Sequence, residues 1–344
     1  LNRVILPVIR RVMPTVIANE LVGVQPMTGP VAQIHTLRVR YADSMTDSST
    51  AYGTSTTAGD EALSPFKIAV AYSGAAGSSA TSFGGTSTTG KANSTSALEG
   101  MPGNRINVQI LKQVVEAKTR KLSARWTFEA AQDAQAMHGI DVEAEIMAAL
   151  AQEITAEIDQ EILLSLRTLA ATEYTYNQAT VSGTATYVGD EHAALAVLIN
   201  RVANLIAQRT RRGAGNWAVV SPASLTVLQS ATTSAFARTT EGTFEAPTNT
   251  KFVGTLNGAM KIYVDSYAAD TQAVLVGYKG TSEADAAAFY CPYIPLMSSG
   301  VVLDPTTFEP VVSFMTRYGY IELTNTASSF GNAADYLGEI AVSN

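Results

Sequence analysis

The longest regular pattern in the chain is a helical stretch, DVEAEIMAALAQEITAEIDQEILLSLRTLA, which spans residues 141–170. Apolar side chains recur along it at intervals of four: Leu150, Ile154, Ile158, Ile162 and Leu166. This spacing predicts one apolar face on a helix of about thirty residues, which would be roughly 45 Å long. Asp141 is placed to cap its N-terminus, and Gly139 is placed to end a shorter helical stretch, EAAQDAQAMH, that precedes it at residues 129–138. A helix of this length predicts a large, flat domain built along it.

Two strand-like segments, residues 35–42 and 104–128, bracket a long region of different composition. In the first segment apolar and polar side chains alternate, the period-two pattern of a strand with one polar face. The apolar positions are Leu37, Val39 and Tyr41, and the polar positions are Thr36, Arg38 and Arg40. Together the two segments predict an extended two-stranded arm with a long tip.

The bracketed region, residues 44–98, is dominated by Ser, Thr, Gly and Ala. Such a composition cannot bury enough apolar area to order itself alone, so we expect a partner surface to hold this region, or else that it stays mobile. Its apolar interruptions are short: the segment FKIAVAY, which contains Phe66, and the isolated Phe83.

The second half of the chain alternates helices with buried strands. Between residues 190 and 300 the helical stretch HAALAVLINRVANLIAQRT precedes the strand WAVV, and short strands punctuated by Gly follow. This order predicts a mixed α/β domain. Residues 301–344 are strand-rich, and we expect them to return to the sheet of the first domain. The fold class predicted for the whole chain is α+β.

One short motif, GTSTTGKA at residues 85–92, resembles the phosphate-binding P-loop except that Ala92 replaces the Ser or Thr that binds Mg²⁺. A P-loop follows a buried strand and opens a helix, whereas this segment lies between stretches rich in Gly and Ser. We therefore interpret Lys91 as a solvated loop charge. A P-loop-like nucleotide-binding enzyme stays a remote alternative.

Other chemical sites find little support. Glu153, Glu157 and Glu161 lie four residues apart, but none of the three histidines follows a Glu at the spacing that di-iron helices use. An acidic edge that faces solvent or a partner is the better interpretation. With three histidines and the single cysteine Cys291, hydrolytic triads have little to draw on. We expect no catalytic residue, no cofactor, no metal and no enzymatic activity.

The charge and the start of the chain exclude two further classes. A net charge of -7 argues against a surface built to bind nucleic acid, because that affinity comes mainly from Lys and Arg. The apolar start is interrupted by Pro7, Arg10, Arg11 and Pro14, so we expect no membrane span. The lone cysteine suits folding in a reducing cytoplasm.

Several long segments resemble the major capsid proteins of T-even-like tailed bacteriophages. They are VIRRVMPTVIANELVGVQPMTGPVAQIHTLRVRYA, VEAKTRKLSARWTFEAAQDAQAMHGIDVEAEI, NWAVVSP, VGTLNG with IYVDSYA, VLVGYKG, FYCPYIPL and DPTTFEPVVSFMTRYG. They occur in order through nearly the whole chain outside residues 44–98 and 174–190. The resemblance implies the Hong Kong 97-type phage capsid fold.

The parts that this resemblance implies match the divisions drawn from the sequence. They are an N-terminal arm (1–34), an extended β-hairpin loop (35–113), a peripheral domain (114–189 and 301–344) with a spine helix (141–170), and an α/β axial domain (190–300). In this family a virus-encoded protease trims the N-terminus, which would explain why the chain begins with Leu1; a boundary or numbering choice is the alternative. Relatives carry a compact insertion domain in the extended loop, whereas this loop is short, so a clasping role for such an insertion is not carried over.

The resemblance implies a structural protein that assembles into hexameric capsomers of an icosahedral head enclosing double-stranded DNA without binding it specifically. It further implies a vertex protein, a portal, a scaffold, a maturation protease and decoration proteins as partners, no membrane, and assembly in the cytoplasm of the bacterial host. A pentameric vertex paralogue or a non-viral encapsulating shell protein of the same fold is the alternative.

Contacts between subunits are expected from charged residues on the N-terminal arm, on the two-stranded arm and on the predicted long helix. The aromatic residues of the region 44–98 are expected to contribute as well. Positive charge on the arm and on the returning strand would lie opposite the acidic edge of the helix. The candidates are Arg10, Arg11, Arg38, Arg40, Phe66, Phe83, Lys118, Arg120, Lys121, Arg125, Glu153, Glu157 and Glu161.

Overall fold

The computed structural model of the chain describes residues 18–44, 57–60, 62, 72–73, 95–177, 188–210, 212–230, 236–238, 250–256, 260–283, 285–324 and 333–343. Four of the candidate contact residues, Arg10, Arg11, Phe66 and Phe83, lie outside these ranges, as does the P-loop-like segment 85–92.

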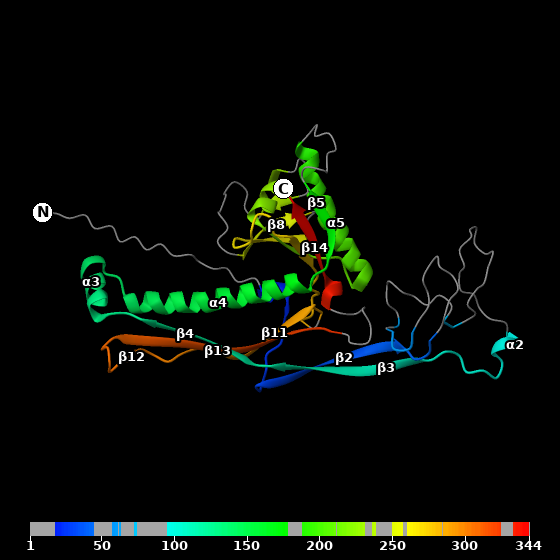
Figure 1. Cartoon of the computed structure of the whole chain (residues 1–344), viewed down its shortest axis with the longest axis horizontal. Helices are drawn as coiled ribbons and strands as arrows, with labels where there is room; N and C mark the ends of the chain where they lie inside the picture. The colour runs from blue at the N-terminus through cyan, green and yellow to red at the C-terminus, as the bar shows by residue number, and fades with distance from the viewer. Residues whose placement is uncertain are drawn as a thin grey trace.

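The molecule is elongated, and a long helix runs along its middle (Figure 1). Helix α4 (Val142–Leu169) lies over a five-stranded sheet. A two-stranded arm, β2 (Val31–Tyr41) with β3 (Ile106–Glu116), projects from one end. A seven-stranded sheet with its own helices stands on the other side of α4. Helices and strands are therefore mixed as the sequence predicts, in an α+β fold.

The predicted long helix and its N-cap are confirmed. Asp141 precedes α4, and its Oδ1 accepts a hydrogen bond from the backbone N–H of Glu143 at 3.1 Å. Helix α3 (Phe128–His138) ends at Gly139, whose φ of 65° lies in the left-handed region that glycine adopts without steric cost. Of the five residues of the predicted apolar face, Ile158 is half-buried and the other four are buried: Leu150, Ile154, Ile162 and Leu166.

The five-stranded sheet is built around its longest strand. Its members are β1 (Gly23–Val24), β11 (Ala288–Ser298), β13 (Pro310–Glu322), β12 (Val302–Leu303) and β4 (Lys118–Arg125). Both β11 and β4 pair antiparallel with β13, on opposite edges of it. Leu150 and Ile154 of α4 pack on Val312 and Phe314 of β13, so one face of the sheet is covered by the helix.

The returning strand of the arm is shorter than predicted. Residues 104–128 were expected as one strand of the arm, but β3 ends at Glu116 and β4 pairs with β13 instead of β2. The reason lies at Pro30, directly before β2, where the backbone has no N–H to offer and only its carbonyl accepts a hydrogen bond from Ala117 N. Beyond this point the strand needs another partner, and β13 supplies it.

The seven-stranded sheet contains segments from both halves of the chain. In order they are β5 (Thr172–Asn177), β14 (Leu337–Ser343), β10 (Val274–Gly277), β6 (Trp217–Val220), β9 (Met260–Asp265), β8 (Thr250–Leu256) and β7 (Phe236–Arg238). Helices α5 (Val188–Thr210) and α6 (Pro222–Ser230) contribute to a core with this sheet. The 3₁₀ turn Ala333–Tyr336 leads into β14.

Sheet membership departs from the predicted divisions at three strands. β14 does not return to the sheet under α4, as was expected of residues 301–344, but pairs with β10, and β5 pairs with β14. β11, in the stretch 190–300 assigned to the α/β domain, pairs with β13. The physical reason is burial: β10 is buried along its whole length and needs a partner on each edge.

The two-stranded arm is confirmed, with β2 and β3 paired antiparallel through eleven residue pairs from Val31–Glu116 to Tyr41–Ile106. At its root Met27, Val115, Phe289 and Cys291 form a small buried cluster with the five-stranded sheet. Gly319 of β13 makes this approach possible, because a Cβ there would lie 2.6 Å from Val115 Cγ2.

Candidate inter-subunit surfaces

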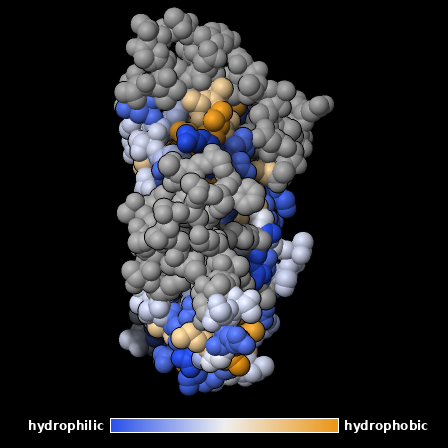
Figure 2. Space-filling model, turned by 90° about the vertical axis from the view of Figure 1, so that its right-hand side faces the viewer, coloured by the Kyte–Doolittle hydropathy of each residue, from blue (hydrophilic) through white to orange (hydrophobic). Residues whose placement is uncertain are grey.

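One face of the arm carries exposed apolar side chains, interspersed with the exposed polar residues Gln33, His35, Lys112 and Glu116. Residues that pair across β2 and β3 share a face, so Leu37 lies beside Ile110, and both side chains are 70% exposed. The exposed hydrophobic residues of this face, called here the apolar arm face, are Val31, Leu37, Ile106, Val108, Ile110 and Val114. Viewed from the end at which the arm projects, hydrophobic and hydrophilic residues lie side by side at the lower end of the molecule (Figure 2).

Arg38 and Arg40 lie on the opposite face of the arm, and each is only 6% exposed. The alternation of β2 is therefore as predicted, but toward the end of the strand the polar face is sheltered as well as the apolar one. On the other face Tyr41 packs on Ala62 and Tyr72, with ring centroids of the two tyrosines 4.5 Å apart. The proposed role of Arg38 and Arg40 in contacts between chains stays a prediction.

Arg120 binds the acidic edge of α4 within a single chain. Its Nη1 donates to Glu157 Oε2 at 3.0 Å, its Nη2 donates to Glu161 Oε2 at 2.7 Å, and its Nε donates to Tyr318 Oη at 2.7 Å. Tyr318 in turn donates a hydrogen bond to the Glu161 carboxylate. The sequence predicts positive charge opposite this acidic edge and assigns the resulting pairs to neighbouring subunits. Here Arg120 makes them within one chain, where they join β4, β13 and α4.

The same cluster shifts the pKa values of its members. Burial alone would raise the pKa of Glu161, but the hydrogen bonds from Tyr318 and Arg120 outweigh it and lower that pKa. Burial and the Glu161 carboxylate raise the pKa of Tyr318 to about 12. Glu161 is therefore held ionised, and the Tyr318 hydroxyl is held as a donor.

The remaining charged candidates are spread along the chain. Arg125 Nη1 lies 3.1 Å from Asp304 Oδ2, which joins β4 to the turn after β12. Lys118, Lys121 and Glu153 are exposed. The structure thus brings Arg120 to Glu157 and Glu161, and contacts of the others with a second chain stay predictions.

A second apolar surface lies at the end of the molecule opposite to the arm, where α3 and β12 are found (Figure 1). The exposed residues there, called the tip patch, are Phe128, Val301, Val302, Leu303 and Phe308. The rings of Phe128 and Phe308 lie 5.5 Å apart, and Phe308 has a positive φ of 58°, which is uncommon for a residue other than glycine. The sequence analysis did not predict this surface. The pattern that could have indicated it is the apolar run VVL directly after Gly300, which is followed by Phe308 in a turn.

Metal and membrane chemistry find no support in the described ranges. No three His, Cys, Asp or Glu side chains of the described residues are grouped as metal ligands. None of the described helices is long and apolar enough to cross a bilayer.

The comparisons with known proteins decide the family. Residues 1–342 match the family described as major capsid protein Gp23. The chain belongs to this Gp23 family. Among its relatives, the major capsid protein of Vibrio phage KVP40 is 31% identical, over 96% of this chain and 78% of the relative. That of Enterobacteria phage T4 is 36% identical over 63% of this chain, and the match spans 45% of the T4 protein.

Solved structures with the same architecture are phage capsids. The mature capsid of bacteriophage PhiM1 has a TM-score of 0.55 at 12% identity, covering 100% of this chain and 92% of that one. The capsid of Myoviridae phage XM1 has a TM-score of 0.54 at 10% identity, covering 99% and 97%. The Gp23-family chain therefore has the Hong Kong 97-type capsid fold that the resemblance implied.

Proposed function

We propose that this Gp23-family protein builds the head shell of a tailed bacteriophage by repeated head-to-tail contacts between copies. The observation that carries the proposal is the position of its two apolar surfaces, the apolar arm face and the tip patch, at opposite ends of an elongated chain. Contacts between unlike surfaces are heterologous, and they close into rings when the rotation between copies is right.

The strength of such a contact suits a shell. Burying a Val, Leu or Ile side chain that is about half exposed contributes roughly 1 kcal/mol, so the apolar arm face supplies about 6 kcal/mol before the costs of association. A single contact of this size is weak. Many of them, linked in a closed shell, raise the overall stability by avidity.

The finer features of the proposal follow the family. Six copies form a capsomer, capsomers form an icosahedral head that encloses double-stranded DNA, and the net charge of -7 leaves the packaged DNA without strong adhesion to the wall. Assembly takes place in the host cytoplasm with a scaffold, a portal, a vertex protein and a maturation protease, and decoration proteins bind the finished head. The protein acts structurally, without catalysis.

The experiment compares two substitutions of the same chemistry. Leu37→Asp removes an apolar side chain from the apolar arm face, whereas Leu164→Asp makes the same change on α4 at a residue 67% exposed and outside both apolar surfaces. We expect Leu37→Asp to leave the chain folded by circular dichroism and to reduce shell yield in sedimentation at least tenfold. Leu164→Asp should assemble. Equal shell yields from the two variants contradict the proposed use of the arm.

Two measurements separate the alternatives. Electron microscopy of purified particles distinguishes a hexamer-forming protein from a pentameric vertex paralogue, and its view of the contents distinguishes DNA from the cargo of a non-viral shell. Equilibrium titration with labelled ATP tests the remote enzyme alternative at residues 85–92, and saturable binding would favour it.

A further inference from the structure

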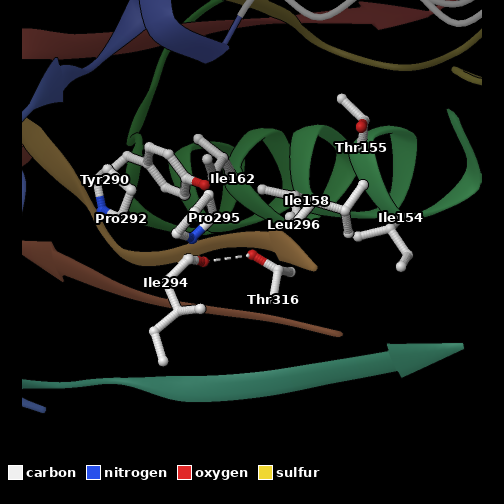
Figure 3. Close-up of a pocket in the computed structure, with 10 residues that line it drawn as sticks. All are labelled: Ile154, Thr155, Ile158, Ile162, Tyr290, Pro292, Ile294, Pro295, Leu296 and Thr316. Carbon is white, nitrogen blue, oxygen red and sulfur yellow. Dashed lines mark hydrogen bonds between the residues drawn. The ribbon is translucent and has the colours of Figure 1, made fainter. Parts of the chain in front are cut away.

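An apolar hollow of about 210 Å³ lies between α4 and β11 (Figure 3). Its walls are Ile154, Ile158 and Ile162 on the helix and Tyr290, Pro295 and Leu296 on the strand. The hollow lies where two core clusters meet, because Ile158 packs at the margin of both. It does not belong to the apolar arm face or to the tip patch.

The hollow exists because β11 leaves its regular register beside β13. The pairing shifts between Pro292 and Ile294 and again between Ile294 and Met297. Prolines at 292 and 295 have no N–H for a ladder. Thr316 Oγ1 donates instead to the Ile294 carbonyl at 3.0 Å, as the dashed line in Figure 3 shows. The strand is thus held in an irregular course beside α4, where Ile154 and Ile162 are buried, Ile158 is half-buried, and Leu296 is 38% exposed.

The described chain begins beside this hollow. Helix α1 (Ala18–Leu21) contacts α4, and Leu21 and Val22 are buried in the same cluster as Ile162. Tyr290, a wall of the hollow, packs against that cluster too. The residues directly before Ala18 therefore start within a few residues' reach of the apolar walls.

The sequence before α1 has the chemistry to fill the hollow. LNRVILPVIRRVMPTVI is rich in Val and Ile, and Pro7 and Pro14 disfavour a continuous helix through it. From Ile162 to Ile154 the wall is two turns of α4, about 12 Å, which about four extended residues can span. Further upstream, Arg10 and Arg11 would then fall near Glu153, which is exposed on α4 next to Ile154.

We propose that the N-terminal segment of the same chain docks in this hollow through the apolar side chains of residues 12–17, VMPTVI. The segment covers the walls of the hollow that are still open to solvent, which are Ile158 on α4 and Pro295 and Leu296 on β11. The contact is made within one subunit, and it does not depend on shell assembly.

Cross-linking of the unassembled full chain tests the proposal. In a Cys291→Ala background, Met13→Cys is combined with Leu296→Cys at the mouth of the hollow, and a short bismaleimide is added. A matched control combines Met13→Cys with Leu164→Cys, an exposed position on α4 away from the hollow. We expect the 13–296 cross-link to form at least tenfold more than the 13–164 cross-link.

Isotope labelling shows whose segment is bound. When labelled and unlabelled chains are mixed, the proposal requires the two cross-linked peptides to carry the same label. Cross-links that join labelled to unlabelled peptides would assign the hollow to a neighbouring copy and overturn the proposal. Equal yields at positions 296 and 164 would overturn it as well.

A second measurement avoids the cysteines. Trypsin cleaves after Arg10 and Arg11, and Ile158→Trp fills the hollow with a larger side chain. We expect Ile158→Trp to speed this cleavage at least fivefold and the control Leu164→Trp to leave the rate unchanged. Cleavage at the same rate in all three proteins contradicts docking.

Discussion

Gly319→Ala should loosen the junction between the arm and the five-stranded sheet. The new Cβ would lie 2.6 Å from Val115 Cγ2 and 3.2 Å from the Glu116 carbonyl oxygen. Val115 is only 3% exposed, so its short side chain cannot turn away into solvent. Overpacking of this kind costs about 1–3 kcal/mol of unfolding free energy, and β3 must shift away from β13 to relieve it.

Hydrogen exchange and thermal unfolding of the unassembled chain measure this effect. We expect the amides of β3 near Val115 to exchange faster in Gly319→Ala while those of β6 in the seven-stranded sheet keep their protection. The Tm should fall by about 2–4 °C for each kcal/mol lost. Gly103→Ala is the matched control, because a Cβ at that position meets nothing within 4 Å.

A double-mutant cycle tests the cause. Val115→Ala alone opens a cavity and is destabilising, but in the Gly319→Ala background it also removes the clashing methyl. The two changes should therefore cost less together than the sum of the single variants. An additive cycle, or a Gly319→Ala chain as stable as Gly103→Ala, would refute the account of this close contact.

Three further substitutions test other contacts. Arg120→Met should lower stability by about 1–2 kcal/mol in urea unfolding, because charge-assisted hydrogen bonds to α4 are lost. The pKa of Glu161 is lowered in the fold, so the ionised carboxylate stabilises the folded chain above the ordinary value of 4.5. This contribution is lost as the pH falls through the lower pKa of the folded state. Arg120→Met should therefore make the unfolding free energy depend less on pH in this acid range. Arg167→Met should cost about 3–5 kcal/mol, because Asp265, 6% exposed and 4.0 Å from the Arg167 guanidinium, would be left buried without its counter-charge; an unchanged Tm would contradict this. Asp141→Ala should cost about 1 kcal/mol through the lost N-cap of α4, with restoration by Asp141→Asn as the check.

The features best predicted from the sequence are those that depend on interactions between residues close together in the chain. The apolar spacing of α4, the cap at Asp141 and the stop at Gly139 depend on contacts within a few turns of chain. The alternation of β2 likewise needs only the strand's own side chains, and its pairing with β3 follows from two strands that bracket one loop. These parts of the fold agree with the prediction.

The pairing of strands that are far apart in the sequence cannot be predicted from local periodicity. The sequence LGEIAVS does not determine that β14 pairs with β10 and not with β13, because an apolar strand can pair with any free edge of a sheet. The burial of Arg38 and Arg40 has the same origin: alternation separates two faces but does not predict how much of each face becomes buried. The tip patch was not predicted because its residues are far apart in the sequence and come together only in the fold, as Phe128 and Phe308 do.

The change of partner at Ala117 has a mechanical consequence. β3 and β4 are one continuous length of backbone, so tension on the arm passes along a covalent chain into the sheet beneath α4. β4 is bound to β13 by eight residue pairs that lie along the line of pull. A pull in that direction stretches all of these pairs in shear at once, whereas a peeling force would break them singly. The arm is thus anchored through its own backbone in the body of the subunit, and a pull on the arm meets the resistance of the whole β4–β13 pairing.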